Sequence, residues 1–305
     1  MAALQKDEVS MELTNINDIR ALLDRHGFRF SKSMGQNFLI ADWVPRDIAE
    51  GAKLGADTGV LEIGPGIGCL TNELSKRAGR VVSVELDKSL KPILAETLSD
   101  LDNVAVVYGD ILKQNVNALV SEHFSGLRPA VCANLPYNVT SPVLTKLIES
   151  GCFESITVMI QREVARRICA APNTADYGAF GIFVQWHMHT EALFDVPPSC
   201  FIPQPKVTSS VIRLTRREAP PVKVRDEQLL FKIIRAAFNQ RRKTLVNALS
   251  DPLGLEKSAL ETLICACGLD ARVRGEALDI ASFAAICEKI SDLYMMLPDT
   301  GKNDT

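Results

Sequence analysis

The 305-residue sequence lacks the features that mark membrane and secreted proteins. It contains no apolar run of about 18 residues or more, the length that a membrane-spanning helix needs. Its start, Met1-Ala-Ala-Leu-Gln-Lys-Asp-Glu, is not typical of a secretory signal peptide. These absences predict a cytoplasmic protein without a membrane partner. Its eight cysteines are scattered, and a cytosolic chain of this size does not need disulfides, so we expect reduced and mostly buried thiols.

A metal-binding pattern is also missing. Cys265, Cys267 and Cys287 come nearest to one, but their spacing matches no zinc motif and no fourth ligand lies near them. We therefore expect no metal. His187 and His189 stand two apart in a segment that we predict to be helical, where residues at this spacing point to different sides. They cannot chelate one ion together, and we expect both to be structural.

The chain has no overall excess of basic residues. Its net charge is −3 and its pI about 5.9, whereas nucleic-acid-binding domains usually carry a basic excess. The basic residues are nevertheless concentrated, because segment 206–243 holds eleven Lys or Arg against three acidic residues, a local charge of +8. Such a stripe can follow a phosphate backbone, although an anonymous run of this kind is more often a solvated helix face. The base-binding motif described below favours RNA contacts, which we assign to Arg235, Arg241, Arg242 and Lys243.

The most informative motif is Val60-Leu-Glu-Ile-Gly-Pro-Gly-Ile-Gly68, an apolar run ending in three glycines at alternate positions. Glycines here let a strand turn sharply into a helix while the backbone approaches a bulky ligand. No Lys-Ser/Thr pair follows, which excludes a phosphate-binding P-loop. The pattern also departs from the dinucleotide fingerprint, and Glu62 would put a carboxylate close to any pyrophosphate. A zwitterionic ligand with an amino group fits better.

Polar groups also end the strands that follow this loop. The strand 80–85 ends in Glu85, roughly 20 residues past the loop, where an acidic residue reaches ribose hydroxyls in this architecture. The next strand ends in Asp110, which can accept a hydrogen bond from an adenine amine. Further on, Asn134-Leu-Pro-Tyr137 offers an amide, a free carbonyl and an aromatic ring, a set that suits a planar base with an exocyclic amine.

These motifs resemble those of known methyltransferases. The glycine loop, Glu85 and Asp110 resemble the S-adenosylmethionine site of Rossmann-like methyltransferases, and Asn134-Leu-Pro-Tyr137 resembles the motif of enzymes that methylate amino groups on bases. With three further segments, the chain resembles the small-subunit ribosomal RNA adenine dimethyltransferase family over most of its length. These segments are Gly35-Gln-Asn-Phe-Leu39, Phe201-Ile-Pro-Gln-Pro-Lys-Val207 and Phe238-Asn-Gln-Arg-Arg-Lys-Thr-Leu245.

The resemblance implies a substrate, a methyl donor and a site. The implied reaction is dimethylation of N6 on two adjacent adenines in the loop near the 3′ end of small-subunit rRNA, with S-adenosylmethionine as donor. The implied partner is an immature small ribosomal subunit whose maturation the enzyme assists, and we expect a monomer. The family makes Asn37 and Leu39 donor ligands, Leu39 through its backbone. The full expected donor-binding set is Asn37, Leu39, Gly64, Gly66, Glu85, Asp110 and Asn134.

The chemistry of adenine N6 explains the residues of the second motif. The lone pair of this nitrogen is delocalised into the ring, so hydrogen-bond acceptors must draw the nitrogen toward tetrahedral geometry. The side-chain oxygen of Asn134 and the backbone carbonyl of Leu135 can accept from the amine, and Pro136 has no competing N–H. Tyr137 can stack on an extruded base, a contact worth about 1–3 kcal/mol, and Phe201 is the candidate for the opposite wall. No histidine base is needed, because methylation makes the remaining proton acidic, and positioning and electrostatics carry most of the rate.

Alternative functions stay open at this point. Taken alone, Asn134-Leu-Pro-Tyr137 could be a turn at a strand end, although its place after the fourth strand favours a catalytic motif. A related antibiotic-resistance methyltransferase modifies large-subunit rRNA and shares much of the catalytic domain, but segment 238–245 favours the small-subunit family. A ribosome-assembly or transcription-associated binding protein could keep the fold without catalysis. The intact glycine loop, Glu85 and Asp110 argue against that loss.

The predicted fold class is α/β: a Rossmann-like class I methyltransferase domain followed by a smaller all-helical C-terminal domain. The alternation of strands and helices predicts a parallel sheet covered on both faces, and the resemblance implies a final hairpin that makes one strand antiparallel. We place the methyltransferase domain at 1–218 and the helical RNA-recognition domain at 219–305. Strands are predicted at 59–63, 80–85, 103–109, 129–134, 155–161 and 207–214, with another near 191–197, and C-terminal helices at 226–238, 241–250, 256–267 and 279–295.

Overall fold

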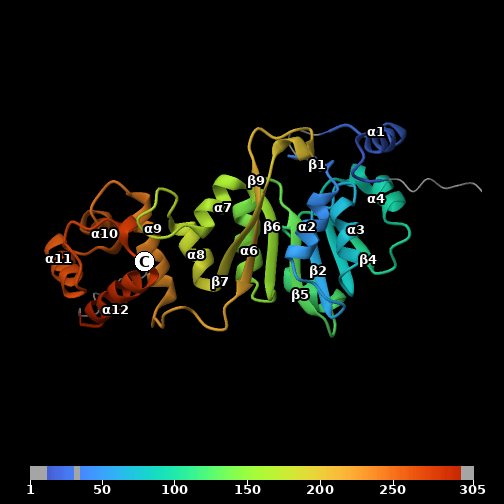
Figure 1. Ribbon diagram of the computed structural model, residues 1–305. Helices are drawn as coiled ribbons and strands as arrows, with labels where there is room; N and C mark the ends of the chain where they lie inside the picture. The colour runs from blue at the N-terminus through green and yellow to red at the C-terminus, as the bar shows by residue number, and fades with distance from the viewer. Residues whose placement is uncertain (1–11, 31–34, 297–305) are drawn as a thin grey trace, which may run out of the picture. The chain divides into compact units, whose positions relative to one another are not determined.

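The computed structural model describes residues 12–30 and 35–296, and in this part the chain forms two compact units (Figure 1). The first contains the described residues up to Ala165 together with Glu191–Arg216, and the second contains Arg166–Thr190 and the residues from Arg217 onward. The predicted domain boundary at residue 218 lies close to the last point at which the chain passes from one unit to the other, between Arg216 and Arg217. Segment 166–190 differs from the prediction, because it groups with the C-terminal helices and not with the sheet.

A seven-stranded sheet carries the site, in the strand order β4-β3-β2-β5-β6-β9-β7. The pairs from β4 through β6 are parallel, whereas β9 pairs with β6 in the antiparallel sense. The expected parallel sheet with an antiparallel strand is therefore confirmed. The strands are β2 (Thr58–Ile63), β3 (Arg80–Glu85), β4 (Val104–Tyr108), β5 (Arg128–Asn134), β6 (Ser155–Gln161), β7 (Met188–Val196) and β9 (Ser209–Arg216).

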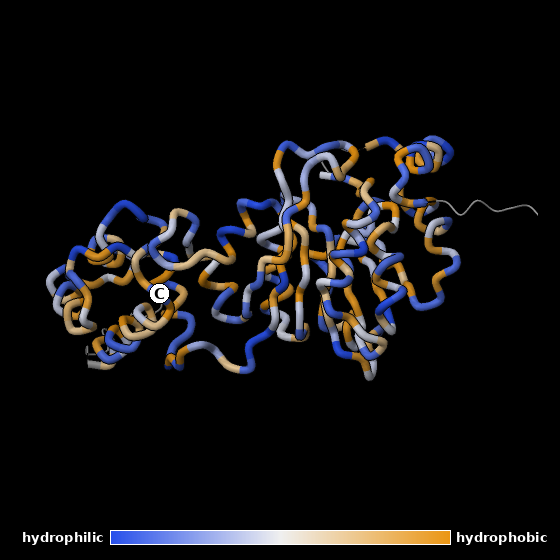
Figure 2. The backbone as a smooth tube through the Cα atoms, in the orientation of Figure 1, coloured by the Kyte–Doolittle hydropathy of each residue, from blue (hydrophilic) through white to orange (hydrophobic). Residues whose placement is uncertain are grey.

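The central strands are buried on both faces, as a parallel sheet requires. Every residue of β2 is buried, and Figure 2 shows hydrophobic residues concentrated along the strands of the sheet. Val60 packs in one cluster with apolar residues of the helices α1 to α4, while its neighbour Leu61 points to the opposite face and is 1% exposed. The helices of this part of the chain are α1 (Ile16–Arg25), α2 (Trp43–Gly51), α3 (Cys69–Ser75), α4 (Lys91–Thr97), α5 (Val116–His123), α6 (Thr140–Glu149) and α7 (Arg162–Cys169).

The second unit is built from helices around its own apolar core (Figure 1, orange to red for the C-terminal part). Ile182 and Trp186 belong to this core together with Leu230 and Ile233 of the C-terminal helices, which explains why segment 166–190 joins this unit. The helices are α8 (Ala179–His187), α9 (Glu227–Asn239), α10 (Leu245–Leu253), α11 (Lys257–Ala266) and α12 (Ile280–Met296).

Two local predictions need correction. The helix predicted at 241–250 begins at Leu245, because Thr244 is its extended N-cap residue and a turn precedes it. His187 is the last residue of α8, whereas His189 lies in β7, so the two histidines do not share a helix. No helix among the described residues is both long and apolar enough to cross a membrane.

Candidate active site

A cleft opens in the first unit at the carboxyl ends of β2, β3, β4 and β5. The space within it, including the part open to solvent, is about 1110 Å³. From β2 the chain continues to β3 and β4 on one side and to β5 and β6 on the other, and open α/β sheets bind ligands at such a switch point. The lining residues come from segments 35–39, 62–67, 84–87, 109–112 and 134–137, with Cys69, Leu70 and Val139.

The structure brings nearly all of the predicted catalytic and donor-binding residues to this cleft. Ten of them line it: Asn37, Leu39, Gly64, Gly66, Glu85, Asp110, Asn134, Leu135, Pro136 and Tyr137.

The glycine loop adopts a backbone that other residues rarely adopt. Gly64, Gly66 and Gly68 have φ angles of 70°, 60° and 93°. A Cβ atom on Gly66 would approach the ring of Phe38 to 3.2 Å, whereas one on Gly64 would meet nothing within 4 Å. The loop therefore exposes bare backbone at Gly64, where a ligand can approach closely.

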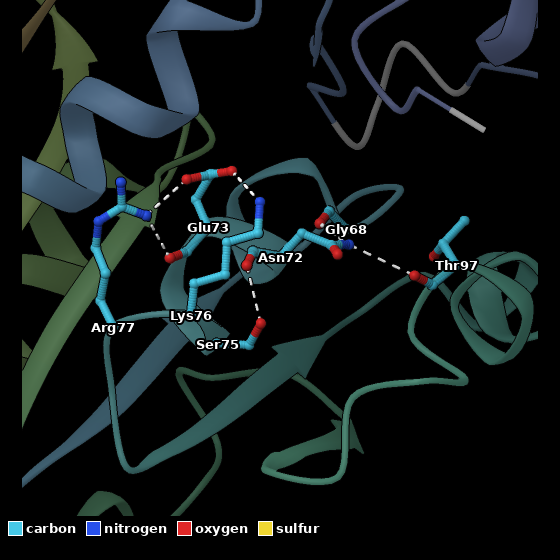
Figure 3. Close-up of polar contacts among 7 residues, drawn as sticks. All are labelled: Gly68, Asn72, Glu73, Ser75, Lys76, Arg77 and Thr97. Carbon is cyan, nitrogen blue, oxygen red and sulfur yellow. Dashed lines mark hydrogen bonds and ion pairs between the residues drawn. The ribbon is translucent and has the colours of Figure 1, made fainter. Parts of the chain in front are cut away.

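The helix that follows the loop is fixed by polar contacts (Figure 3). Asn72 Nδ2 donates to the carbonyl of Gly68 at 3.1 Å and to that of Thr97, in α4, at 3.5 Å. The next residue, Glu73, pairs with Lys76 and Arg77 at the end of the same helix, each at 2.6 Å. The Asn72 contacts connect the end of the glycine loop and the start of α3 to the end of α4, whereas the Glu73 pairs are local to α3.

Glu62 lies at the base of the cleft and is 1% exposed. Its Oε2 accepts hydrogen bonds from Thr71 Oγ1 at 2.7 Å and Ser83 Oγ at 2.6 Å. Burial raises the pKa of this carboxyl to about 7, an effect that the two hydroxyls oppose and the nearby Glu85 reinforces. Glu62 therefore links β2 to α3 and β3. The glycine-loop motif had not indicated this structural role.

Glu85 is the last residue of β3, and Asp110 lies two residues beyond the end of the neighbouring strand β4. Glu85 is 6% exposed and accepts the backbone N–H of Asp87 at 2.7 Å, and burial raises its pKa. Asp110 accepts the backbone N–H of Leu112 at 2.9 Å. Gln36 Nε2 donates to Asp87 at 2.7 Å, which connects the segment before β1 to the end of β3. The two carboxylates thus flank the cleft, and each accepts a backbone N–H from the residues that follow it.

The second motif continues directly from β5. Asn134 Nδ2 donates to the carbonyl of Asn37 at 3.5 Å, so the side-chain oxygen remains as an acceptor. The backbone N–H of Leu135 donates to Met159 of β6 at 3.1 Å, and the Tyr137 hydroxyl shares a 2.7 Å hydrogen bond with Ser209 Oγ. This motif is held at both ends, and the contact with Ser209 was not predicted from the sequence.

Phe201 is the predicted site residue that does not reach the cleft. It belongs to β8 (Phe201–Ile202), which pairs antiparallel with β1 (Phe38–Leu39), so that Phe201 lies opposite Leu39. Its side chain is 1% exposed, packs in the core cluster, and is not among the residues that line the cleft. Its role as a wall of the base pocket stays a prediction that this placement does not support.

The predicted RNA-contacting residues lie in the second unit and differ in their surroundings. Arg235, Arg242 and Lys243 are exposed, with no ion pair to another described residue. Arg241 is engaged internally: its guanidinium donates to Glu276 Oε2 at 2.7 Å and to the carbonyls of residues 175 and 174 at 2.8 and 3.1 Å. The basic stripe is thus less continuous than the sequence indicates, and other members such as Arg216, Arg217 and Arg225 also bond within the protein.

Cys265, Cys267 and Cys287, whose spacing did not match a metal motif, are free thiols, as are the other five cysteines. Among the residues with a described placement, no group of three or more His, Cys, Asp or Glu is arranged to hold a metal ion.

The strand order, the glycine loop and the cleft beside it define a Rossmann-like methyltransferase domain. A sequence profile of ribosomal RNA adenine dimethylase matches residues 27–292. The chain is 49% identical over 288 residues to ribosomal RNA small subunit methyltransferase A of Clostridium perfringens, which covers 93% of this chain and 99% of the relative. A protein of the same name from Geobacillus thermodenitrificans is 47% identical over 280 residues, with 90% and 96% covered. The chain belongs to the ribosomal RNA adenine dimethylase family, so the predicted family and enzyme class are confirmed.

Solved structures agree on the fold. The 23S rRNA methyltransferase ErmE has a TM-score of 0.64 and 27% identity, covering 84% of this chain and all of its own. A dimethyladenosine transferase from Plasmodium falciparum has a TM-score of 0.69 and 23% identity, covering 81% and 95%, a likeness that concerns the fold alone.

The buried Glu62 carboxyl generates a prediction about pH. Its pKa is about 7 in the folded chain and near the ordinary 4.5 when unfolded, so the folded state binds more protons between these values. Its contribution to the free energy of unfolding is fully present below pH 4.5 and is lost as the pH rises through 7. Glu62→Gln keeps the shape and removes the titration, so its stability relative to wild type should rise by about 3 kcal/mol across this window.

Urea unfolding at a series of pH values, followed by Trp43 fluorescence in a Trp186→Phe background, measures this difference in the first unit. Glu149→Gln, an exposed substitution of the same kind on α6, should leave the pH profile unchanged. Parallel profiles for Glu62→Gln and wild type would show that Glu62 keeps an ordinary pKa.

Proposed function

We propose that this chain transfers methyl groups from S-adenosylmethionine to N6 of two adjacent adenines in the loop near the 3′ end of small-subunit rRNA. The observation that supports this best is that Glu85 and Asp110 line the same cleft as Asn134 and Tyr137. One cavity thus offers groups suited to a nucleoside-containing donor beside groups suited to an adenine amine. The product is N6,N6-dimethyladenosine, and the substrate is an immature small ribosomal subunit, on which the enzyme acts as a cytoplasmic monomer.

Donor binding is assigned to the carboxylates and the glycine loop. Glu85 accepts hydrogen bonds from the ribose hydroxyls and Asp110 accepts one from the adenine amine of the donor. Burial raises the pKa of Glu85 because its carboxylate has lost water, and two donated hydroxyl bonds would compensate that loss. The bare backbone at Gly64 allows the amino-acid part of the donor to approach, next to Gly66 and Asn37.

Acceptor chemistry is assigned to residues 134–137. The side-chain oxygen of Asn134 and the carbonyl of Leu135 accept from adenine N6, and Tyr137 stacks on the extruded base. The N6 lone pair then attacks the sulfonium methyl carbon, the bond from sulfur to carbon breaks, and the methylated nitrogen releases a proton. A monomethylated amine keeps one N–H for the same acceptors, which permits the second transfer.

The choice of ribosomal subunit is supported by the comparisons. The chain is 49% identical to a relative named for the small subunit and 27% identical to ErmE, which is named for 23S rRNA. We assign the RNA contacts of the second unit to Arg235, Arg242 and Lys243, which are exposed and carry no described ion pair. A binding protein without catalysis is disfavoured because the cleft keeps both sets of groups.

Glu85→Gln should weaken the binding of S-adenosylmethionine roughly 10- to 100-fold without RNA present, because a hydrogen bond to a charged acceptor is replaced by a weaker one. Titration calorimetry measures this directly. Glu149→Gln, a matched change outside the cleft, should bind the donor as wild type does. Unchanged affinity in Glu85→Gln would remove Glu85 from the donor site.

Replacing Arg242 and Lys243 together by glutamine should weaken binding to small-subunit RNA and reduce its salt dependence, by about 0.7–0.9 units of slope for each phosphate that the variant no longer binds. The matched control replaces the exposed Lys257 and Lys289, which changes the charge equally elsewhere on the second unit. Arg241→Gln should instead destabilise this unit, because Arg241 is bound internally. Equal RNA affinities for the pair variant and its control would assign Arg242 and Lys243 to an ordinary solvated surface.

Incubation of the protein and donor with immature small subunits and, separately, with naked large-subunit RNA tests the substrate. Mass spectrometry of nuclease digests should find N6,N6-dimethyladenosine only in the small-subunit RNA. Methylation confined to large-subunit RNA would assign the chain to the resistance methyltransferases. No methylation of either RNA would favour the binding protein.

A further inference from the structure

The Tyr137 hydroxyl is anchored to a residue outside its own motif. It shares a 2.7 Å hydrogen bond with Ser209 Oγ, and among the described residues Ser209 is its only hydrogen-bond partner. Ser209 is the first residue of β9 and is 0% exposed. Tyr137 lines the cleft, whereas Ser209 does not, so the bond reaches from the cleft wall into the sheet.

The backbone of Ser209 is held in place by its pairing with β6. Ser209 lies opposite Gln161 in the antiparallel pairing of β6 and β9, and the backbone N–H of Arg162, the first residue of α7, donates to the carbonyl of Thr208 at 3.0 Å. The side chain of the following residue, Ser210, points to the opposite face of the strand, where its hydroxyl donates to Asp195 of β7 at 2.5 Å, a bond that does not include Ser209. The strand pairing therefore fixes the backbone that carries Ser209, and the Ser209 hydroxyl can in turn hold the ring that it bonds.

The motif and its anchor share one support. The backbone N–H of Leu135 donates to Met159 of β6, two residues before Gln161, which lies opposite Ser209. Leu135 bonds to the end of β6 directly, and the Tyr137 hydroxyl is connected to the same end of β6 through Ser209. Without the hydroxyl bond, only packing would limit rotation of the ring about its side-chain torsions.

The same segment also reaches the donor side of the cleft. Residues 201–209 begin in β8, where Phe201 lies opposite Leu39, and end at the partner of Tyr137. Phe38 and Leu39 line the cleft on the side of the glycine loop. One short stretch of chain therefore contacts both walls of the cleft.

We propose that Ser209 is a positioning residue: its hydrogen bond fixes the plane of the Tyr137 ring, and thereby the angle at which a stacked adenine presents N6 to the methyl group. This inference rests on the proposed function. Reaction rates depend steeply on such alignment. The second transfer is the more sensitive one, because the first methyl group occupies space beside N6 and leaves fewer productive orientations.

The test is a double-mutant cycle of Ser209→Ala and Tyr137→Phe, assayed on immature small subunits. Each single variant should lower kcat about two- to tenfold, the effect of one neutral hydrogen bond, and raise the fraction of monomethylated product. The double variant should be no worse than either single one, because both remove the same bond. Affinity for S-adenosylmethionine should stay unchanged. Ser210→Ala, a neighbouring serine bonded to Asp195, is the matched control and should keep the wild-type product ratio.

The cycle guards against misfolding, because Tyr137→Phe keeps the ring and leaves Ser209 intact. Additive losses, or a Tyr137→Phe variant with the wild-type rate and product ratio, would overturn the positioning role. A wild-type protein that methylates neither ribosomal RNA would instead refute the proposed function itself, so the two failures are distinguishable.

Discussion

The Glu62 carboxyl group is the point at which three elements of the first unit meet. The carboxyl group lies buried between Thr71 of α3 and Ser83 of β3. The hydroxyl groups of these two residues donate hydrogen bonds to it, which offsets the cost of removing it from water. The three glycines with positive φ lie between Glu62 and Thr71, so the loop is tied at both ends while its backbone stays bare. Ser83 stands two residues before Glu85 on the same strand, and the same bonds therefore help to fix the carboxylate that flanks the cleft.

Four residues of the cleft could be predicted from the strand pattern because each ends an apolar strand or follows one closely, whereas Asn37 and Leu39 were indicated only by the family resemblance. Parallel strands end on one edge of a sheet, so Gly64, Glu85, Asp110 and Asn134 had to come together once the strands were recognised. The roles of other residues depend on contacts with distant parts of the chain. The partner of Tyr137 stands at the start of β9, and nothing near the motif indicates it.

Contacts with distant parts of the chain also explain why the structure places some residues differently from the sequence-based expectation. In the sequence, Arg241 is one of three adjacent basic residues, which favoured a contact with RNA. In the structure its guanidinium group bonds to the carbonyls of residues 174 and 175 and to the carboxylate of Glu276. The sequence presents Phe201 as a candidate aromatic wall, but its side chain is 1% exposed and packs in the core cluster of the first unit. Segment 166–190 continues the alternating pattern of the sheet domain, and the partners that place it in the helical unit come later in the chain.

This interleaved connectivity has a consequence for synthesis on the ribosome. Residues 166–190 leave the exit tunnel before α9 to α12 exist, so Tyr177, Ile182 and Trp186 must wait for the helices that bury them. The sheet unit, in contrast, contains no residue after Arg216 and can fold first. Residues 166–190 are then an apolar insertion within its sequence. The nascent chain thus passes through a stage with exposed apolar surface, during which the completed sheet unit must tolerate an unfolded insert.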